Sequence, residues 1–269
     1  MARIDGAQIS LWRVACILAL TILTVGCVSI AAAGQQENTA ARALPKDEPA
    51  PRTSDGHPDL SGVWFPDMRQ YGPPVVAAEA KEVPFQPWAA AKIAAMSPAE
   101  LEYGRPSVNC APRGTPGMIR LNPYPMKLVQ TRDELIQLNE LNNNFRIIPL
   151  DGRPHTKNPD PTFAGESTAH WEGDTLVIDT IAIDERTWNN FIGWFHSDQQ
   201  HVVERLTRTS KNVLTYQVTI EDPKVLTRPW TSVPRQWSLR NVDLIEYHCT
   251  NNHEVDQYKS LVQQEGNSK

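Results

Sequence analysis

The stretch Ser167-Thr-Ala-His-Trp-Glu-Gly-Asp-Thr-Leu-Val-Ile-Asp-Thr180 predicts two β-strands joined by a tight turn at Glu172-Gly173-Asp174. A third strand is expected at residues 201–208, where apolar and polar side chains alternate. Alternation with a period of two is typical of antiparallel strands that bury one face. This part of the chain therefore predicts an antiparallel sheet packed on a core.

Shorter strands of the same kind are expected elsewhere. The turn signal Arg132-Asp133 lies between two apolar-rich segments, residues 126–131 and 134–139, as in a β-hairpin. Further strands are expected at residues 59–65, 145–150, 214–220, 236–239 and 244–249. Helical signals are confined to residues 87–101, where an alanine-rich run precedes Ser97-Pro98. The pattern predicts a mainly β fold: an antiparallel β-barrel-like or β-sandwich domain with one or two short N-terminal helices.

The N-terminus has the features of an export signal. Basic residues precede a long apolar run, residues 14–30, which ends in Ala31-Ala32-Ala33-Gly34. We expect residues 1–33 to be a signal peptide. Two alternatives are a lipoprotein leader that ends at residue 26, with Cys27 lipidated, and an uncleaved anchor, because the run approaches the roughly 20 residues that span a bilayer. All three place the protein outside the cytoplasm, as a periplasmic or secreted protein, which the lipoprotein alternative anchors through a lipid.

Composition divides the rest of the chain. Residues 34–58 are polar and proline-bearing and are expected to form a disordered tether, residues 59–258 a single β-rich domain, and residues 259–269 a polar tail. The formal net charge of −5 argues against a nucleic-acid partner. Beyond the leader the chain has two cysteines, Cys110 and Cys249, which allow one intramolecular disulfide. Two unpaired thiols are the alternative.

Six short motifs follow one another along the chain in a recognisable order. They are Asp59-Leu60-Ser61-Gly62-Val63-Trp64, Asn109-Cys110-Ala-Pro-Arg-Gly, Val129-Gln130-Thr131, Asp151-Gly152-Arg153-Pro154-His155, Trp171-Glu172-Gly173-Asp174-Thr175-Leu176 and His196-Ser197. Together they resemble a group of exported, largely uncharacterised bacterial proteins that share the Trp-Glu-Gly-Asp-Thr-Leu strand–turn–strand motif. The resemblance spans residue 59 to about residue 258 and implies export and the domain boundaries. It implies no particular reaction.

Motifs for a catalytic metal, a nucleophilic serine or a nucleotide are absent from the sequence. There is no His-Glu-x-x-His, no paired Cys-x-x-Cys, no Gly-x-Ser-x-Gly and no phosphate-binding loop. His196, Asp198 and His201 are close in sequence, but their spacing on a strand or loop is not specific for a metal. We therefore expect no metal and no cofactor, and general acid–base chemistry remains.

The acid–base candidates are His170, His196 and Glu204. His196 follows two aromatic residues, and such an apolar setting lowers the pKa of a histidine. Glu204 shares its strand face with Val202 and Leu206, so it is either buried and paired with a histidine or an arginine, or solvated on the outer face. We expect the two histidines to exchange a proton and Glu204 to orient one of them. The expected substrate-binding residues are Trp171, Trp188, Trp194, Tyr124, Arg146 and Asn190.

These residue types favour an exported small-molecule enzyme. Its chemistry would be cofactor-free acid–base catalysis of the isomerase, hydratase or lyase type, in an aromatic-lined pocket that takes a small organic molecule. Two alternatives stay open: a non-catalytic binding protein for a small apolar ligand, and a structural envelope lipoprotein. Neither the substrate nor the oligomeric state follows from the sequence.

Overall fold

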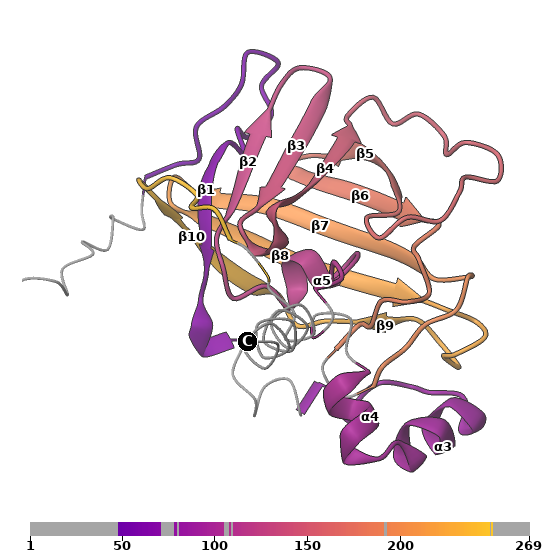
Figure 1. Ribbon diagram of the computed structural model, residues 1–269. Helices are drawn as coiled ribbons and strands as arrows, with labels where there is room; N and C mark the ends of the chain where they lie inside the picture. The colour runs from indigo at the N-terminus through magenta and orange to yellow at the C-terminus, as the bar shows by residue number, and fades with distance from the viewer. Residues whose placement is uncertain are drawn as a thin grey trace, which may run out of the picture. The chain divides into compact units, whose positions relative to one another are not determined.

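A computed structural model describes residues 48–70, 78–79, 81–104, 108, 110–190, 193–247 and 249 (Figure 1). The predicted leader with Cys27, residues 34–47 of the predicted tether, and the tail at 259–269 lie outside the described residues. Within the described part of the chain, no helix combines the length and the apolar character needed to cross a membrane.

The domain is built on one ten-stranded antiparallel sheet. Its strands are β1 (Gly62–Pro66), β2 (Met126–Gln130), β3 (Glu134–Asn139), β4 (Asn144–Pro149), β5 (Glu166–Glu172), β6 (Thr175–Ile181), β7 (His201–Ser210), β8 (Val213–Glu221), β9 (Trp230–Thr231) and β10 (Arg235–Arg240). The order is β4-β3-β2-β1-β10-β8-β7-β6-β5, and β9 pairs with β8 beside this path. The predicted hairpins β2–β3 and β5–β6 are both present.

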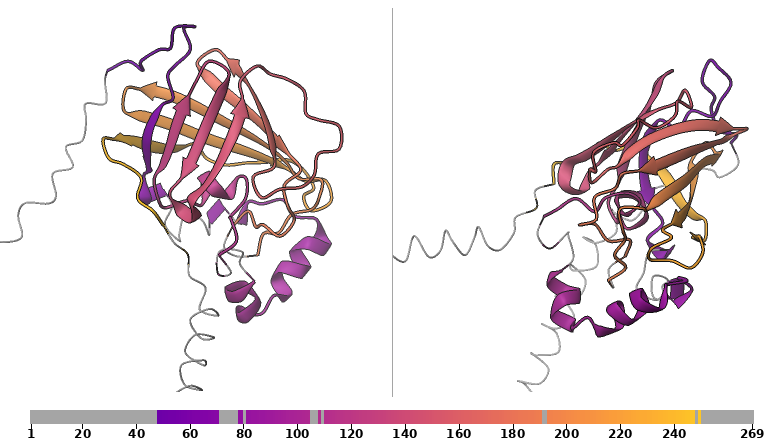
Figure 2. Two further views of the ribbon diagram at one scale, coloured as in Figure 1. Left: turned by 45° about the horizontal axis from the view of Figure 1, so that its top comes forward. Right: turned by 90° about the vertical axis from the view of Figure 1, so that its right-hand side faces the viewer.

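The sheet curls until its two edge strands, β4 and β5, come close together (Figures 1 and 2). The result is a nearly closed barrel, so the predicted mainly β, barrel-like fold is confirmed. The path from β4 to β5 contains nine strands, each antiparallel to the next, and the two edges therefore run in the same direction. The connection between them, residues 150–165, must return along the whole barrel. We call this connection the β4–β5 loop and the gap between the two edges the seam.

Helices are few and short, as expected. α3 (Pro87–Ala95) and α4 (Pro98–Tyr103) follow one another, and Ser97 caps α4 in a reciprocal arrangement with Glu100. The Ser97 hydroxyl accepts the Glu100 N–H, and the Glu100 carboxylate accepts the Ser97 N–H, which satisfies two N–H groups at the helix start. α5 (Gly117–Arg120) is an additional four-residue helix whose residues are all buried.

One predicted strand is wrong. Residues 244–249 form no strand in the described residues of this segment, and β10, the preceding strand, already pairs with β1 on one edge and β8 on the other. Side chains of the β3–β4 connection hold the segment instead: the Asn143 amide donates to the Tyr247 carbonyl at 2.8 Å, and Glu140 accepts the Ile245 N–H at 3.0 Å. The predicted Cys110–Cys249 disulfide then closes it, with the two Cα atoms 5.6 Å apart.

The packed domain begins before residue 59. Within residues 48–58, part of the predicted tether, the Arg52 guanidinium donates to both carboxylate oxygens of Asp174 at 2.8 and 2.7 Å. The His57 ring stacks on Trp171, with the ring centroids 4.6 Å apart. This stretch therefore lies against the β5–β6 hairpin, which carries both partners.

Candidate functional site

A chain of alternating carboxylates and imidazoles crosses the outer face of the barrel. Glu166 begins β5, Asp179 lies in β6, His201 begins β7 and Glu221 ends β8. The sheet register places His201 directly opposite Glu221 and Asp179 opposite Val203, two residues further along β7. His155 reaches the strands from the β4–β5 loop. The alternating pattern of the strands puts all four strand residues on the outer face, where two of them, Glu166 and Asp179, contact the loop histidine.

Both histidines of this histidine–carboxylate chain, His155 and His201, lie between two carboxylates. Nδ1 and Nε2 of His155 are 3.1 Å from Glu166 Oε1 and 2.8 Å from Asp179 Oδ1. Nε2 and Nδ1 of His201 are 2.9 Å from Asp179 Oδ2 and 3.3 Å from Glu221 Oε2. A neutral imidazole has one N–H, so a ring that donates to carboxylates from both nitrogens must be an imidazolium. The geometry therefore favours protonated histidines.

The electrostatics of the chain agree with this geometry. The hydrogen bond to Asp179 raises the pKa of His201 and outweighs the opposing effect of partial burial. Burial alone would raise the pKa of Asp179, but hydrogen bonds from His201 and His155 outweigh it and hold that pKa below its usual value. The pKa of Glu166 is lowered, first by hydrogen bonds from Thr156 and then by His155. These shifts favour the charged forms of Asp179, Glu166 and His201.

At its Glu166 end, the histidine–carboxylate chain borders a hollow of about 630 Å³ at the seam. Its lining comes from β4, from the start of β5 and from the β4–β5 loop: Ile147, Pro149, Arg153, Pro154, Thr156, Asn158, Pro159, Asp160, Thr162, Gly165, Glu166, Ser167 and Thr168. We call it the seam hollow. Carboxylates, hydroxyls and one guanidinium share it with apolar groups, so it offers both polar and apolar contacts.

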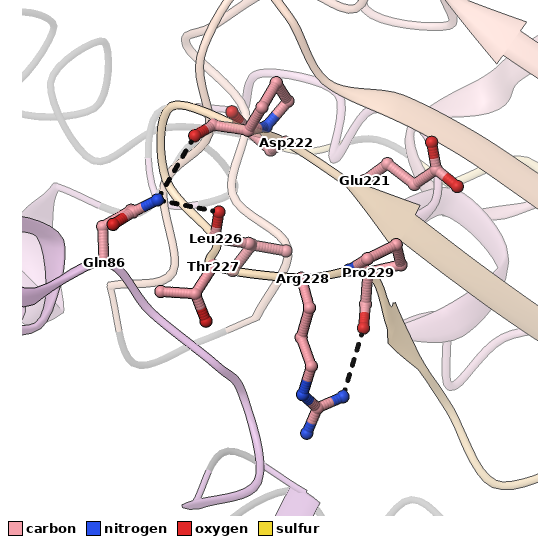
Figure 3. Close-up of a pocket in the computed structure, with 8 residues that line it drawn as sticks. Gln86, Glu221, Asp222, Leu226, Thr227, Arg228 and Pro229 are labelled. Atoms are coloured by element: carbon pink, nitrogen blue, oxygen red, sulfur yellow. Dashed lines mark hydrogen bonds between the residues drawn. The ribbon is translucent and has the colours of Figure 1, made fainter.

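At its other end, the histidine–carboxylate chain reaches Glu221, which borders a smaller hollow of about 330 Å³ (Figure 3). There the Gln86 amide donates to the Pro223 and Leu226 carbonyls at 3.5 and 3.2 Å. The Glu221 and Arg228 side chains point in different directions (Figure 3). The polar groups of this hollow do not converge on a common point, which a specific ligand site requires.

The three expected acid–base residues do not form one site. His170 lies on the outer face of β5, with 53% of its side chain exposed and Glu172 at 3.4 Å. Glu204 lies on the inner face of β7 and is fully buried, so the sheet separates it from His170. His196 is buried between β6 and β7 and bonds to the Thr187 hydroxyl and the Ser197 carbonyl at 2.7 and 3.0 Å. Its burial lowers its pKa, the direction expected from the sequence.

Glu204 has the buried, paired position, one of the two alternatives that its strand face allows, and its partner is an arginine. The Arg146 guanidinium donates to Oε2 at 2.6 Å, and the Tyr216 hydroxyl donates to Oε1 at 3.0 Å. Arg146 also donates to the Gln137 side chain at 2.9 Å. This network connects β3, β4, β7 and β8 inside the barrel and uses both oxygens of the carboxylate. Its visible role is to hold the strands together.

The expected substrate-binding residues are dispersed, and none of them lines the seam hollow or the smaller hollow. Trp194 packs in the core against Trp230, and its backbone N–H donates to the Asn190 side chain at 2.9 Å. Tyr124 contacts Tyr247 near the disulfide-linked segment. The remaining three are Arg146, in the Glu204 network, Trp171, stacked on His57, and Trp188, which pairs with Phe195 in an isolated bridge.

His155 was not among the acid–base candidates expected from the sequence, and His201 was considered only as a possible metal ligand. Strand alternation places Asp179 and His201 on one face, which is a usable signal, but nothing local indicates that residue 155 reaches that face. In the part of the chain that the structure describes, no group of three or more His, Cys, Asp or Glu is placed to hold a metal ion. His248 and His253 lie outside the described residues.

Fold and site together define a class: a nearly closed antiparallel β-barrel with a charged histidine–carboxylate chain on its outer face and a hollow at its seam. Comparisons with protein-family models, with curated proteins and with solved structures give no match. The functional argument therefore depends on the site alone.

Proposed function

We propose that the protein is an exported binding protein whose ligand, a small polar organic molecule with a basic nitrogen, occupies the seam hollow. The size and the lining of this hollow support the proposal most strongly. Its volume of about 630 Å³ is in the usual range for small-molecule sites, roughly 300–1,000 Å³. The export signal in the sequence and the disulfide favour export.

The charge distribution around the hollow favours a basic ligand. The guanidinium of Arg153 is occupied by both oxygens of Asp151, at 2.8 to 3.1 Å. Asp160 lines the hollow, is exposed, and makes no hydrogen bond or ion pair within the described residues. Its carboxylate can therefore bind a ligand ammonium or guanidinium group, while Ile147 and Pro149 provide an apolar wall.

The hydrogen-bond partners of the histidines favour binding over acid–base catalysis. A general base needs a ring nitrogen that can approach the substrate proton. Both nitrogens of His155 and of His201 already face carboxylates. His170, His196 and Glu204, the residues expected to catalyse, lie apart from one another and from the seam hollow. Ligand retention without conversion is the expected behaviour.

The first test is native mass spectrometry of protein produced with its own leader. We expect a co-purified small basic molecule and an N-terminus that starts at or after residue 27. A ligand that is chemically converted on incubation would make the protein an enzyme instead. Protein that carries and accepts no small molecule, when offered a panel of amines, would contradict the proposal.

The second test is the variant Asp160→Asn. Loss of one exposed charge–charge contact weakens ligand binding by about 1 kcal/mol, so we expect the Kd measured by calorimetry to rise about fivefold. Asp133→Asn is the matched control, because Asp133 is exposed in the β2–β3 turn, outside the hollow, and its carboxylate makes no hydrogen bond within the described residues. Equal Kd values for both variants would place the ligand elsewhere.

A further inference from the structure

We propose that Glu166, His155, Asp179, His201 and Glu221 form a pH-sensitive clasp, which holds the β4–β5 loop beside the seam hollow while both histidines are protonated and releases the loop when they lose their protons. The inference rests on the proposed binding function only in that the regulated site is the seam hollow. The opening of the loop is measurable without any ligand.

The loop has few other attachments to the barrel in its middle part. Near its ends the Gly152 N–H donates to the Ala169 carbonyl at 2.9 Å, and the Thr162 N–H donates to the Ala182 carbonyl at 3.0 Å. Between them the contacts with the strands come from His155 and from Thr156, whose N–H donates to Glu166 at 2.7 Å. Residues 154, 159 and 161 are prolines, which have no N–H to donate. The middle of the loop is therefore held by His155 and by the N–H and hydroxyl of Thr156, through Glu166 and Asp179 of the clasp.

The clasp changes from attraction to repulsion when its histidines lose their protons. With both rings protonated, three carboxylates and two imidazoliums leave one net negative charge. With both rings neutral, the same five groups carry three, and one nitrogen of each ring turns a lone pair toward a carboxylate oxygen. The other charged groups on the loop are Asp151, Arg153, Lys157 and Asp160. Asp151 and Arg153 pair with each other, so they do not replace the lost histidine charges.

The direction of the pH effect follows from these charges. The pKa of His201 is raised in the folded protein, so the stabilisation from its protonation is complete below the ordinary value of about 6.5 and disappears as the pH rises through the raised value. The pKa values of Asp179 and Glu166 are lowered, so their contribution disappears only at acidic pH, below about 4. The clasp is therefore closed at pH 6 and opens as the pH rises through the raised pKa of His201.

Limited proteolysis tests the clasp on the full protein. Lys157–Asn158 is a tryptic bond in the middle of the loop, whereas Arg153 is followed by Pro154, which trypsin cleaves poorly. We expect the rate of cleavage after Lys157 to rise severalfold from pH 6 to pH 8, beyond the change in trypsin activity, because the clasp opens over this range. The variant His155→Gln/His201→Gln reports the change that trypsin alone causes, and its cleavage should already be fast at pH 6.

His170→Gln is the matched control, because His170 lies on the same face of β5 but outside the clasp, and it should behave as the unmodified protein. Hydrogen exchange of the Thr156 amide provides a measurement that needs no variant. Its protection, corrected for the intrinsic exchange rate, should fall severalfold from pH 6 to pH 8. Unchanged protection, or the same pH dependence of cleavage with and without the two histidines, would overturn the clasp. A pH-dependent loop in a protein that takes no ligand would contradict the binding function alone.

Discussion

The variant Arg146→Met is expected to lower the free energy of unfolding by about 3–5 kcal/mol, the largest effect of any single substitution considered for this protein. The Glu204 carboxylate is fully buried, and Arg146 is its charged partner at 2.6 Å. Without the guanidinium, a buried charge keeps only the Tyr216 hydroxyl. Urea denaturation followed by circular dichroism measures the loss.

The double variant Arg146→Met/Glu204→Leu separates the cost of an unpaired charge from the value of the ion pair. Removing both partners leaves no buried charge, so much of the lost stability should return. Arg205→Met is the matched control, because Arg205 is the residue after Glu204 and forms its ion pair with Glu172 on the outer surface. It should cost less than about 1 kcal/mol. Equal losses in the free energy of unfolding for Arg146→Met and Arg205→Met would show that the buried ion pair contributes no more to stability than the exposed one.

Removal of the Cys110–Cys249 disulfide is expected to lower the free energy of unfolding by about 4 kcal/mol. The two cysteines are 139 residues apart, so the bond closes a long loop and restricts the unfolded chain strongly. It also holds residues 241–247, which form no strand. The variant Cys110→Ser/Cys249→Ser should therefore unfold at a lower urea concentration than the oxidised protein.

Chemical reduction provides the control for this experiment. The unmodified protein in excess reductant should unfold at the same urea concentration as the double serine variant, because the two lack the same bond. A double serine variant as stable as the oxidised protein would contradict the prediction. A reduced protein less stable than the variant would point to a separate effect of the free thiols.

Local sequence patterns predict most of the strands and the alternation of their faces. Alternation in β7 and β8 predicts both elements, and the face that Glu204 shares with Val202 and Leu206 allows either a buried or a solvated carboxylate, of which the structure has the buried one. The turn at Glu172-Gly173-Asp174 likewise predicts the β5–β6 hairpin. These features are local: side chains of an extended chain alternate between two faces, and turn residues act on their own backbone.

Which side chains meet depends instead on the tertiary structure. Arg146 reaches Glu204 across 58 positions of sequence because the sheet curls β4 toward β7, and residues 244–249 form no strand because both edges of β10 are occupied. His155 joins Asp179 and His201 because the odd number of strands from β4 to β5 makes their connection return along the barrel. Strand neighbours and loop paths depend on how the whole sheet closes, which is a property of distant segments packing together and not of any local pattern.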